Sequence, residues 1–197
     1  MRGGERCLEV FCELFPDADL YTLLHVKGSV SASIEKHPIK TSFIQRLPYS
    51  SRYYRYCLPL FPAAIEAFDL KGYDLVLSSS HCVAKGVKTS PQTLHISYIH
   101  TPMRYIWDQY EAYFGNGRSG WMTRKGMDLV RPWLQRWDVA SSRGIYALIA
   151  ASHHVADRIR RRYGRDAYVI HPPVDLHAFP ISQKNNGFYL IVTALAT

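Results

Sequence analysis

The sequence has few cysteines and no long apolar run, and each shortage excludes a class of protein. The four cysteines form no Cys-x-x-Cys pair and have no histidine at metal-ligand spacing, which argues against a disulfide framework and a zinc site. No run of about 18 apolar residues and no apolar signal core occurs, which predicts neither a membrane span nor an export signal. These shortages favour a cytoplasmic protein without a bound metal.

Acidic residues are outnumbered, 16 against 24 basic ones, which gives a net charge of +8 and favours an anionic partner. Nucleic acid, an anionic membrane surface and phosphorylated small molecules all fit, but no nucleic-acid motif is present, so we expect no nucleic-acid partner. The arginines at 160–165 and the Trp-bearing helix 121–137 could meet lipid head groups at the inner face of the plasma membrane. Buried tryptophans with solvated arginines explain the same pattern.

Periodicity predicts strands that alternate with helices. The expected strands are 18–24, 73–78, 93–99, 145–151, 168–170 and 188–195. The expected helices start near residue 4 and at 121 and 152, with broken helical pieces over 43–68 and a loop around 28–33. This order predicts an α/β fold with a Rossmann-like parallel sheet covered on both faces. Because a glycine pair that opens a helix usually follows a strand, a first strand is expected to be missing before Gly3.

Candidate site residues follow the strands, since ligands of parallel sheets bind at the carboxyl ends. Ser80 and His81 follow the strand at 73–78, and His100 follows the strand at 93–99, which places all three at the mouth of a cleft. Gly3 and Gly4 open a helix whose bare N–H groups suit phosphate. A plain strand-to-helix turn and a partly buried structural histidine are the alternatives. No G-x-S-x-G motif surrounds the serines, so nucleophilic catalysis is set aside.

Four blocks in the same order make the pattern specific. They are Gly3-Gly4-x4-Leu-x2-Phe, His100-Thr101-Pro102-Met103-Arg104-Tyr105-x-Trp107-Asp108, Ala151-Ser152-x2-Val155-Ala156-x-Arg158-Ile159, and Val169-Ile170-x-Pro172-Pro173-Val174-Asp175. Together they resemble family 4 glycosyltransferases over nearly the whole chain, and in particular bacterial mannosyltransferase-like members that build surface polysaccharides.

The resemblance implies a GT-B architecture and a metal-independent, retaining transfer of a hexose, such as mannose, from a nucleotide sugar to a lipid-linked or polysaccharide acceptor. It places Gly3 and Gly4 near the donor diphosphate and His100 at the reacting sugar as the catalytic residue. Arg104, in the same block, joins Ser80 and His81 as an acceptor or cleft-lining residue. No cofactor besides the donor is implied.

The family pattern is incomplete toward the end of the chain. It implies an acceptor-side domain over 1–175, then over 176–197 a linker and the first strand of a donor-binding domain that is mostly missing. Ala194 stands where relatives carry an arginine, and Gly144 and Ala151 replace common Asp and Asn residues. Without the donor-gripping groups, we expect this chain alone to be inactive. The alternative is a non-catalytic module that binds an acceptor or a membrane.

Overall fold

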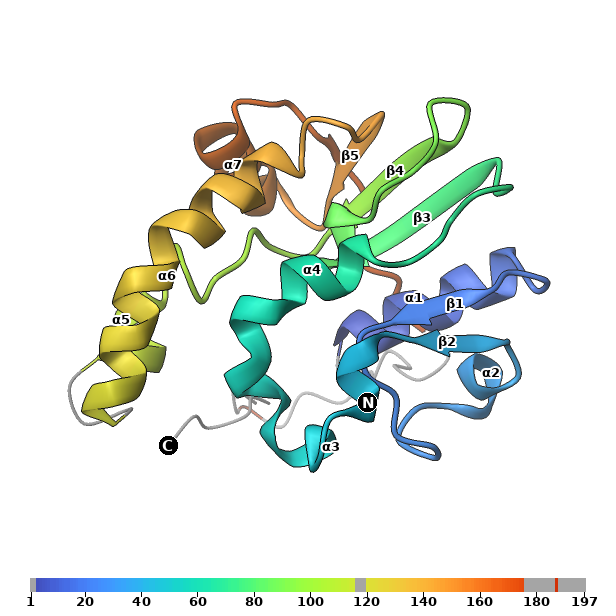
Figure 1. The fold of residues 1–197 in the computed structure, drawn as a ribbon. Helices are drawn as coiled ribbons and strands as arrows, with labels where there is room; N and C mark the ends of the chain where they lie inside the picture. The colour runs from blue at the N-terminus through green and yellow to red at the C-terminus, as the bar shows by residue number, and fades with distance from the viewer. Residues whose placement is uncertain (1–2, 116–119, 176–186, 188–197) are drawn as a thin grey trace.

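Two parallel sheets form the frame of the molecule. A computed structural model of the chain describes residues 3–115, 120–175 and 187 (Figure 1). The larger sheet has the order β3-β4-β5-β6 and the smaller one pairs β1 with β2, and every pair is parallel. The strands are β1 (Leu20–Thr22), β2 (Ile39–Thr41), β3 (Leu75–Ser80), β4 (Leu94–Ile99), β5 (Ala147–Ala150) and β6 (Tyr168–Val169). The predicted α/β fold with a parallel sheet is confirmed.

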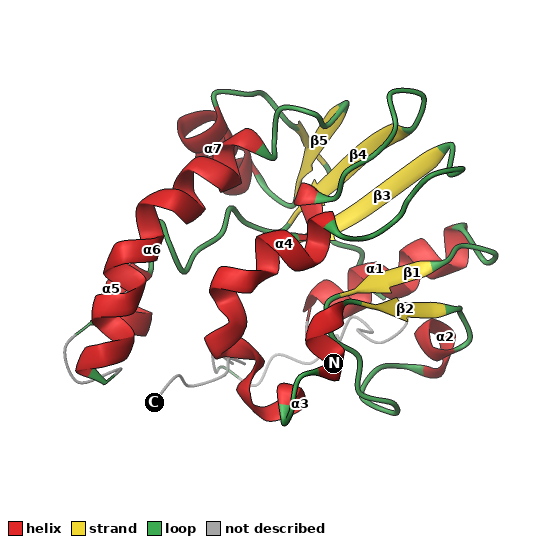
Figure 2. Cartoon of the chain, in the orientation of Figure 1, coloured by secondary structure: helices red, strands yellow, loops and turns green. Residues whose placement is uncertain are grey.

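Helices connect the strands and cover both faces of the larger sheet (Figure 2). The α-helices are α1 (Gly3–Leu14), α2 (Ala32–Glu35), α3 (Ser50–Tyr53), α4 (Phe61–Glu66), α5 (Tyr110–Phe114), α6 (Trp121–Ala140) and α7 (His153–Tyr163). The 3-10 helices are η1 (Phe43–Arg46), η2 (Tyr54–Leu60) and η3 (Ala84–Gly86). Phe11 of α1 packs edge-on against Tyr98, with ring centroids 5.6 Å apart. Ile159 of α7 packs with Ile99, the next residue of β4, so the two helices lie on opposite faces.

The local signals that predicted helix ends are confirmed. The hydroxyl of Ser152 accepts a hydrogen bond from the backbone N–H of Val155, and Gly164 ends α7 with a left-handed φ of 64°. The broken helical pieces over 43–68 are also present. The expected strand 188–195 lies outside the described residues.

One prediction in the first third of the chain is correct only in part. The polar stretch around 28–33 was expected to be a loop, but Ser33 belongs to the short helix α2, and strand β2 follows it unpredicted. Strand β2 has only one apolar residue, Ile39, and its partner Leu20 lies far back in the sequence. A strand that depends on such a distant backbone partner leaves almost no periodic signal of its own.

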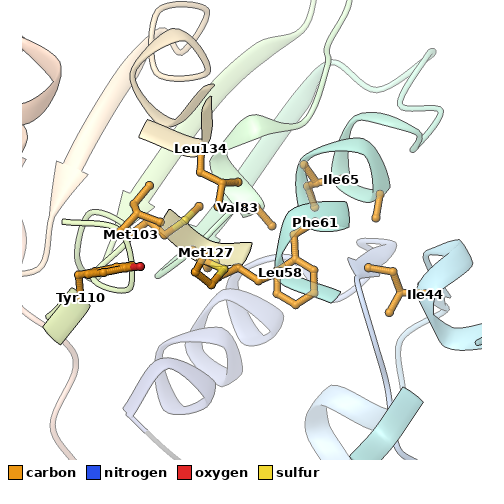
Figure 3. Close-up of a cluster of buried hydrophobic side chains, with 12 residues drawn as sticks. Ile44, Leu58, Phe61, Ile65, Val83, Met103, Tyr110, Met127 and Leu134 are labelled. Atoms are coloured by element: carbon orange, nitrogen blue, oxygen red, sulfur yellow. The ribbon is translucent and has the colours of Figure 1, made fainter. Parts of the chain in front are cut away.

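The main hydrophobic core lies between the helices and the segment that follows β4 (Figure 3). Its buried members are Ile44, Leu58, Phe61, Ala64, Ile65, Cys82, Val83, Met103, Ile106, Tyr110, Met127 and Leu134. They come from η1, η2, α4, α5, α6 and the chain after β3 and β4. The core therefore fixes the long helix α6 against the segments that leave the sheet at its carboxyl edge.

Beside this core lies a buried ion pair between Lys85 of η3 and Asp138 of α6, 1% and 0% exposed. The ammonium lies 2.9 Å from Oδ1 of Asp138 and donates to the backbone oxygen of Asp138 at 2.7 Å. Oδ2 of Asp138 accepts from Trp107 at 2.8 Å and from the Tyr163 hydroxyl at 3.0 Å. Burial lowers the pKa of Lys85, and the carboxylate opposes that shift. Four segments thus meet at one carboxylate.

Breaking this pair should be costly, because one buried charge is then left without its partner. We expect Lys85→Met to lower the free energy of unfolding by about 3–5 kcal/mol. The double variant Lys85→Met with Asp138→Asn should lose less than twice that free energy, because Asp138→Asn removes the charge that Lys85→Met leaves without a partner. Urea unfolding measures both. Arg160→Gln, which breaks the exposed pair with Asp166, is the control and should cost less than about 1 kcal/mol. A Lys85→Met loss no larger than this control would contradict the prediction.

Candidate functional site

The candidate site lies where β3 and β4 end, at the carboxyl edge of the larger sheet. The register pairs Ser79 with Tyr98 and Ser80 with Ile99, and His100 follows directly after β4. Because side chains alternate along a strand, Ser79, Tyr98 and His100 share one face while Ser80 and Ile99 share the other. The site is therefore built on the face that α1 covers.

The first turn of α1 lies directly against His100. A Cβ placed on Gly4 would lie 3.6 Å from Nε2 of His100, whereas one placed on Gly3 would meet nothing within 4 Å. The positions of Gly4 and His100 agree with the expected juxtaposition of the helix start and the histidine. The roles assigned to them remain predictions.

The His100 imidazole is held by polar and aromatic neighbours. Its Nε2 lies 2.9 Å from the hydroxyl of Ser79, and its ring meets Tyr98 edge-on with centroids 5.1 Å apart. Burial, and to a smaller extent the charge of His81, lower the pKa of His100. At neutral pH the ring is therefore neutral. Because Nε2 is engaged by the Ser79 hydroxyl, Nδ1 is the nitrogen left for a substrate hydroxyl, and it donates or accepts according to the tautomer.

The structure does not place Ser80 on a cleft surface, so that prediction is corrected. Ser80 is 1% exposed, and its hydroxyl accepts a hydrogen bond from the backbone N–H of Lys85 at 3.3 Å. It points to the face opposite His100, where η3 folds back over it. Ser79, which the site prediction omitted, is the serine in contact with His100. Side chains alternate along β4, so Tyr98 shares a face with His100, and the β3–β4 register pairs Tyr98 with Ser79. This alternation is the signal that would have identified Ser79.

The other two predicted cleft residues lie near the same edge. His81 is exposed and follows β3, and its charge contributes to the lowered pKa of His100. Arg104 is partly exposed on the turn after β4, and its guanidinium makes no hydrogen bond or ion pair within the part of the chain that the structure describes. A partly exposed, unpaired arginine at this edge is available to an anionic ligand.

Helix α7 holds the segment that begins at His100, from the opposite face of the sheet. Arg158 donates to the hydroxyl of Thr101 at 2.6 Å and also pairs with Asp108. Arg162 donates to Asp108 at 2.8 Å, and its guanidinium stacks over Trp107 at 4.8 Å. Both ends of the His100–Asp108 segment are thereby tied to one helix. Arg162, which could have met a lipid head group, is used for this internal contact.

Over residues 3–115 and 120–175, no three His, Cys, Asp or Glu side chains converge to hold a metal ion. In the same part of the chain, no helix is long and apolar enough to cross a membrane. A surface hollow of about 880 Å³ lies at the amino edge of the sheet, between Leu94 and Tyr146, on the side away from His100. We place the site by the convergence of residues around His100, because hollow size alone carries no chemistry.

A family model for Glycosyltransferase Family 4 matches residues 3–178. The chain belongs to glycosyltransferase family 4. The match includes the glycine pair, the His100–Asp108 segment and the Arg158 helix, which the fold brings to one edge of the sheet. Searches of the curated proteins and of the solved structures found no match. A family 4 glycosyltransferase acts on a sugar donor and an acceptor. The residues that converge around His100 form the candidate site for these substrates in this domain.

In this glycosyltransferase, His100 should titrate below the ordinary histidine value of about 6.5. Burial disfavours the charged ring, and a protonated His81 would repel a second proton. Histidine ring signals followed by NMR against pH measure this pKa. We expect His81→Asn to move the pKa of His100 upward, and His154→Asn, on the exposed side of α7, to leave it unchanged. A pKa at or above the ordinary value in the unmodified protein would contradict the burial argument.

Proposed function

We propose that this family 4 glycosyltransferase transfers a hexose, with mannose the first to test, from a nucleotide sugar to a lipid-linked or polysaccharide acceptor, with retention at the anomeric carbon. One observation supports the proposal: the first turn of α1 and a neutral His100 meet at the carboxyl edge, so that a Cβ built on Gly4 would lie 3.6 Å from Nε2 of His100. A nucleotide sugar carries its charged diphosphate next to its sugar. The start of α1 suits the diphosphate, and His100 suits a sugar hydroxyl.

The proposed diphosphate site is the amino end of α1. Helix α1 has 12 residues, and its first N–H groups have no partner within the helix, so its start attracts a negative group. Neither Gly3 nor Gly4 has a side chain to block the approach, and the space beyond Gly3 is open. Because the helix terminus itself supplies positive charge to the diphosphate, the proposed reaction is metal-independent.

The proposed role of His100 is to hold the reacting sugar. With Ser79 fixing one side of its ring, the imidazole presents a defined direction to a sugar hydroxyl. The reaction is then accelerated by orienting the acceptor hydroxyl toward the anomeric carbon and by stabilising the departing diphosphate. His81 and Arg104 border the same edge and are proposed to contact the acceptor.

The proposed setting is the cytoplasmic side of the membrane, where a nucleotide sugar and a lipid-linked acceptor can meet. The net charge of +8 favours peripheral attachment to an anionic surface. In this proposal residues 1–175 are the acceptor-side domain and 176–197 lead into a donor-binding domain. Apart from Gly187, residues 176–197 lie outside the described part of the chain.

Substitutions at His100 and Gly4 test the site. In a version extended through the proposed donor-binding domain, we expect His100→Ala to reduce transfer from a radiolabelled nucleotide sugar about a hundredfold or more while the variant stays folded. Gly4→Ala should fold normally, since 3.6 Å is an ordinary contact, but its methyl group covers His100 and should weaken donor binding measured by calorimetry. Gly126→Ala, on an open part of α6, is the matched control and should leave donor binding unchanged.

The same assays separate the two hypotheses that the sequence left open. Transfer that persists in a metal chelator supports the metal-independent reaction, and loss of transfer would overturn that part. An extended protein that binds glycan or lipid-linked acceptors, yet neither binds nor turns over any nucleotide sugar, would instead be a non-catalytic binding module. Normal transfer by His100→Ala would refute the assigned site.

A further inference from the structure

Helix α6 has an apolar side that no described residue covers. Its buried residues Met127, Leu134 and Asp138 recur at helical spacing and face the domain. On the opposite side, the exposed fractions of the large apolar residues lie between 48% and 83%. We call this side the outward face of α6; its residues are Trp121, Met122, Lys125, Leu129, Pro132, Trp133 and Arg136. Soluble surfaces rarely gather two tryptophans with other large apolar side chains on one helix face.

The charges free to act on this face are positive. Lys125, Arg136 and the nearby Arg143 make no side-chain hydrogen bond or ion pair with any residue in the described ranges. In contrast, Arg131, toward the inner side of α6, donates to the backbone oxygen of Ile106. The acidic residue at the border of the face, Asp128, accepts a hydrogen bond from Tyr110. The outward face therefore offers unpaired cations among apolar side chains.

A surface hollow of about 400 Å³ adjoins the outward face toward its carboxyl end. Its lining residues are Trp107, Pro132, Gln135, Arg136, Val139 and Arg143. Two of the six are arginines and none is acidic. Guanidinium groups donate two parallel hydrogen bonds to phosphate oxygens, so two unpaired arginines at one hollow fit a phosphate group.

We propose that the outward face of α6 docks the protein on an anionic membrane, with its apolar side chains in the lipid interface and Arg136 and Arg143 on a lipid phosphate. This deepens the proposed function, on which it rests, by naming the surface that brings the enzyme to a lipid-linked acceptor. Tryptophan, leucine and basic residues on one helix face are the composition that binds in the plane of a membrane interface.

The positive charges on the outward face argue against two kinds of protein partner, a second copy of this chain and a different protein. A second copy of this chain related by twofold symmetry would bring the same patch against itself, and Lys125, Arg136 and Arg143 would face their own counterparts. A dry interface with another protein would bury these cations at a cost of desolvation. At an anionic bilayer the same cations stay hydrated and meet phosphates.

Vesicle flotation tests the proposal. The purified protein is mixed with phosphatidylcholine vesicles that either contain or lack phosphatidylglycerol, at low and high salt. We expect binding to the anionic vesicles only, weakened by salt. The double variant Arg136→Gln with Arg143→Gln should lose about fivefold in binding for each arginine. Leu129→Gln should also weaken binding, including the part that salt does not remove.

Matched controls lie on other surfaces. Lys36→Gln with Lys71→Gln removes the same amount of charge from exposed sites, and Leu14→Gln removes an exposed leucine at the end of α1. Both should float with anionic vesicles nearly as well as the wild type. An equal loss in the two charge-changing doubles would mean that net charge, not the outward face, drives binding. That result would overturn the proposal.

Two more measurements keep this inference separate from the proposed function. Light scattering reports the oligomeric state, and a wild-type dimer that Leu129→Gln dissociates would assign the face to self-association and refute membrane docking. His100→Ala should float like the wild type, while the α6 variants should still bind nucleotide sugar. Loss of flotation with intact donor binding, or the reverse, shows which of the two ideas has failed.

Discussion

The arrangement of the helices depends on the buried carboxylate of Asp138. This carboxylate is paired with Lys85 from the chain after β3, with Trp107 from the chain after β4 and with Tyr163 from α7. Removing a carboxylate and an ammonium from water is costly unless the remaining polar positions are satisfied, so this site requires all four segments to be in place together. Gly86 fits the same constraint, because a side chain there would overlap Trp137. The pair therefore selects one packing of α6 on the sheet.

That packing also sets the geometry at His100. The segment that begins at His100 ends at Trp107 and Asp108, and these two residues are held by Asp138 and by the arginines of α7. At its start, Thr101 is held by Arg158. On the other face, α1 closes over the ring through Gly4. The histidine is thus located by contacts from both sides of the sheet, and none of the contacts from α7 would be visible from the local sequence.

The division between what the sequence predicts and what it misses follows the range of each interaction. The cap at Ser152, the left-handed Gly164 and the polar end of β4 at His100 are local, and each was predicted to within a few residues. Strand β2 depends on a partner 19 residues away in the sequence. Ser80 is buried by η3, and the pattern of residues in β3 does not predict this burial. The Arg158–Asp108 and Lys85–Asp138 pairs join residues about 50 positions apart in the sequence. Pairing over that separation has no local signal, so the composition showed that arginines are numerous but not which residues they contact.

Trp107 connects the proposed docking surface to the proposed active site. Its indole N–H donates to Asp138 in the core, while Trp107 also lines the same hollow as Arg136 and Arg143, and its ring lies under Arg162. A lipid phosphate bound in that hollow would thus lie against the same residue that anchors the His100 segment. Because rotation of α6 would expose Asp138, the buried pair resists a change in the angle between the outward face of α6 and the carboxyl edge of the sheet. In the proposed complex, docking α6 on the membrane sets the direction in which His100 faces the lipid-linked acceptor, and no additional moving part is needed to align them.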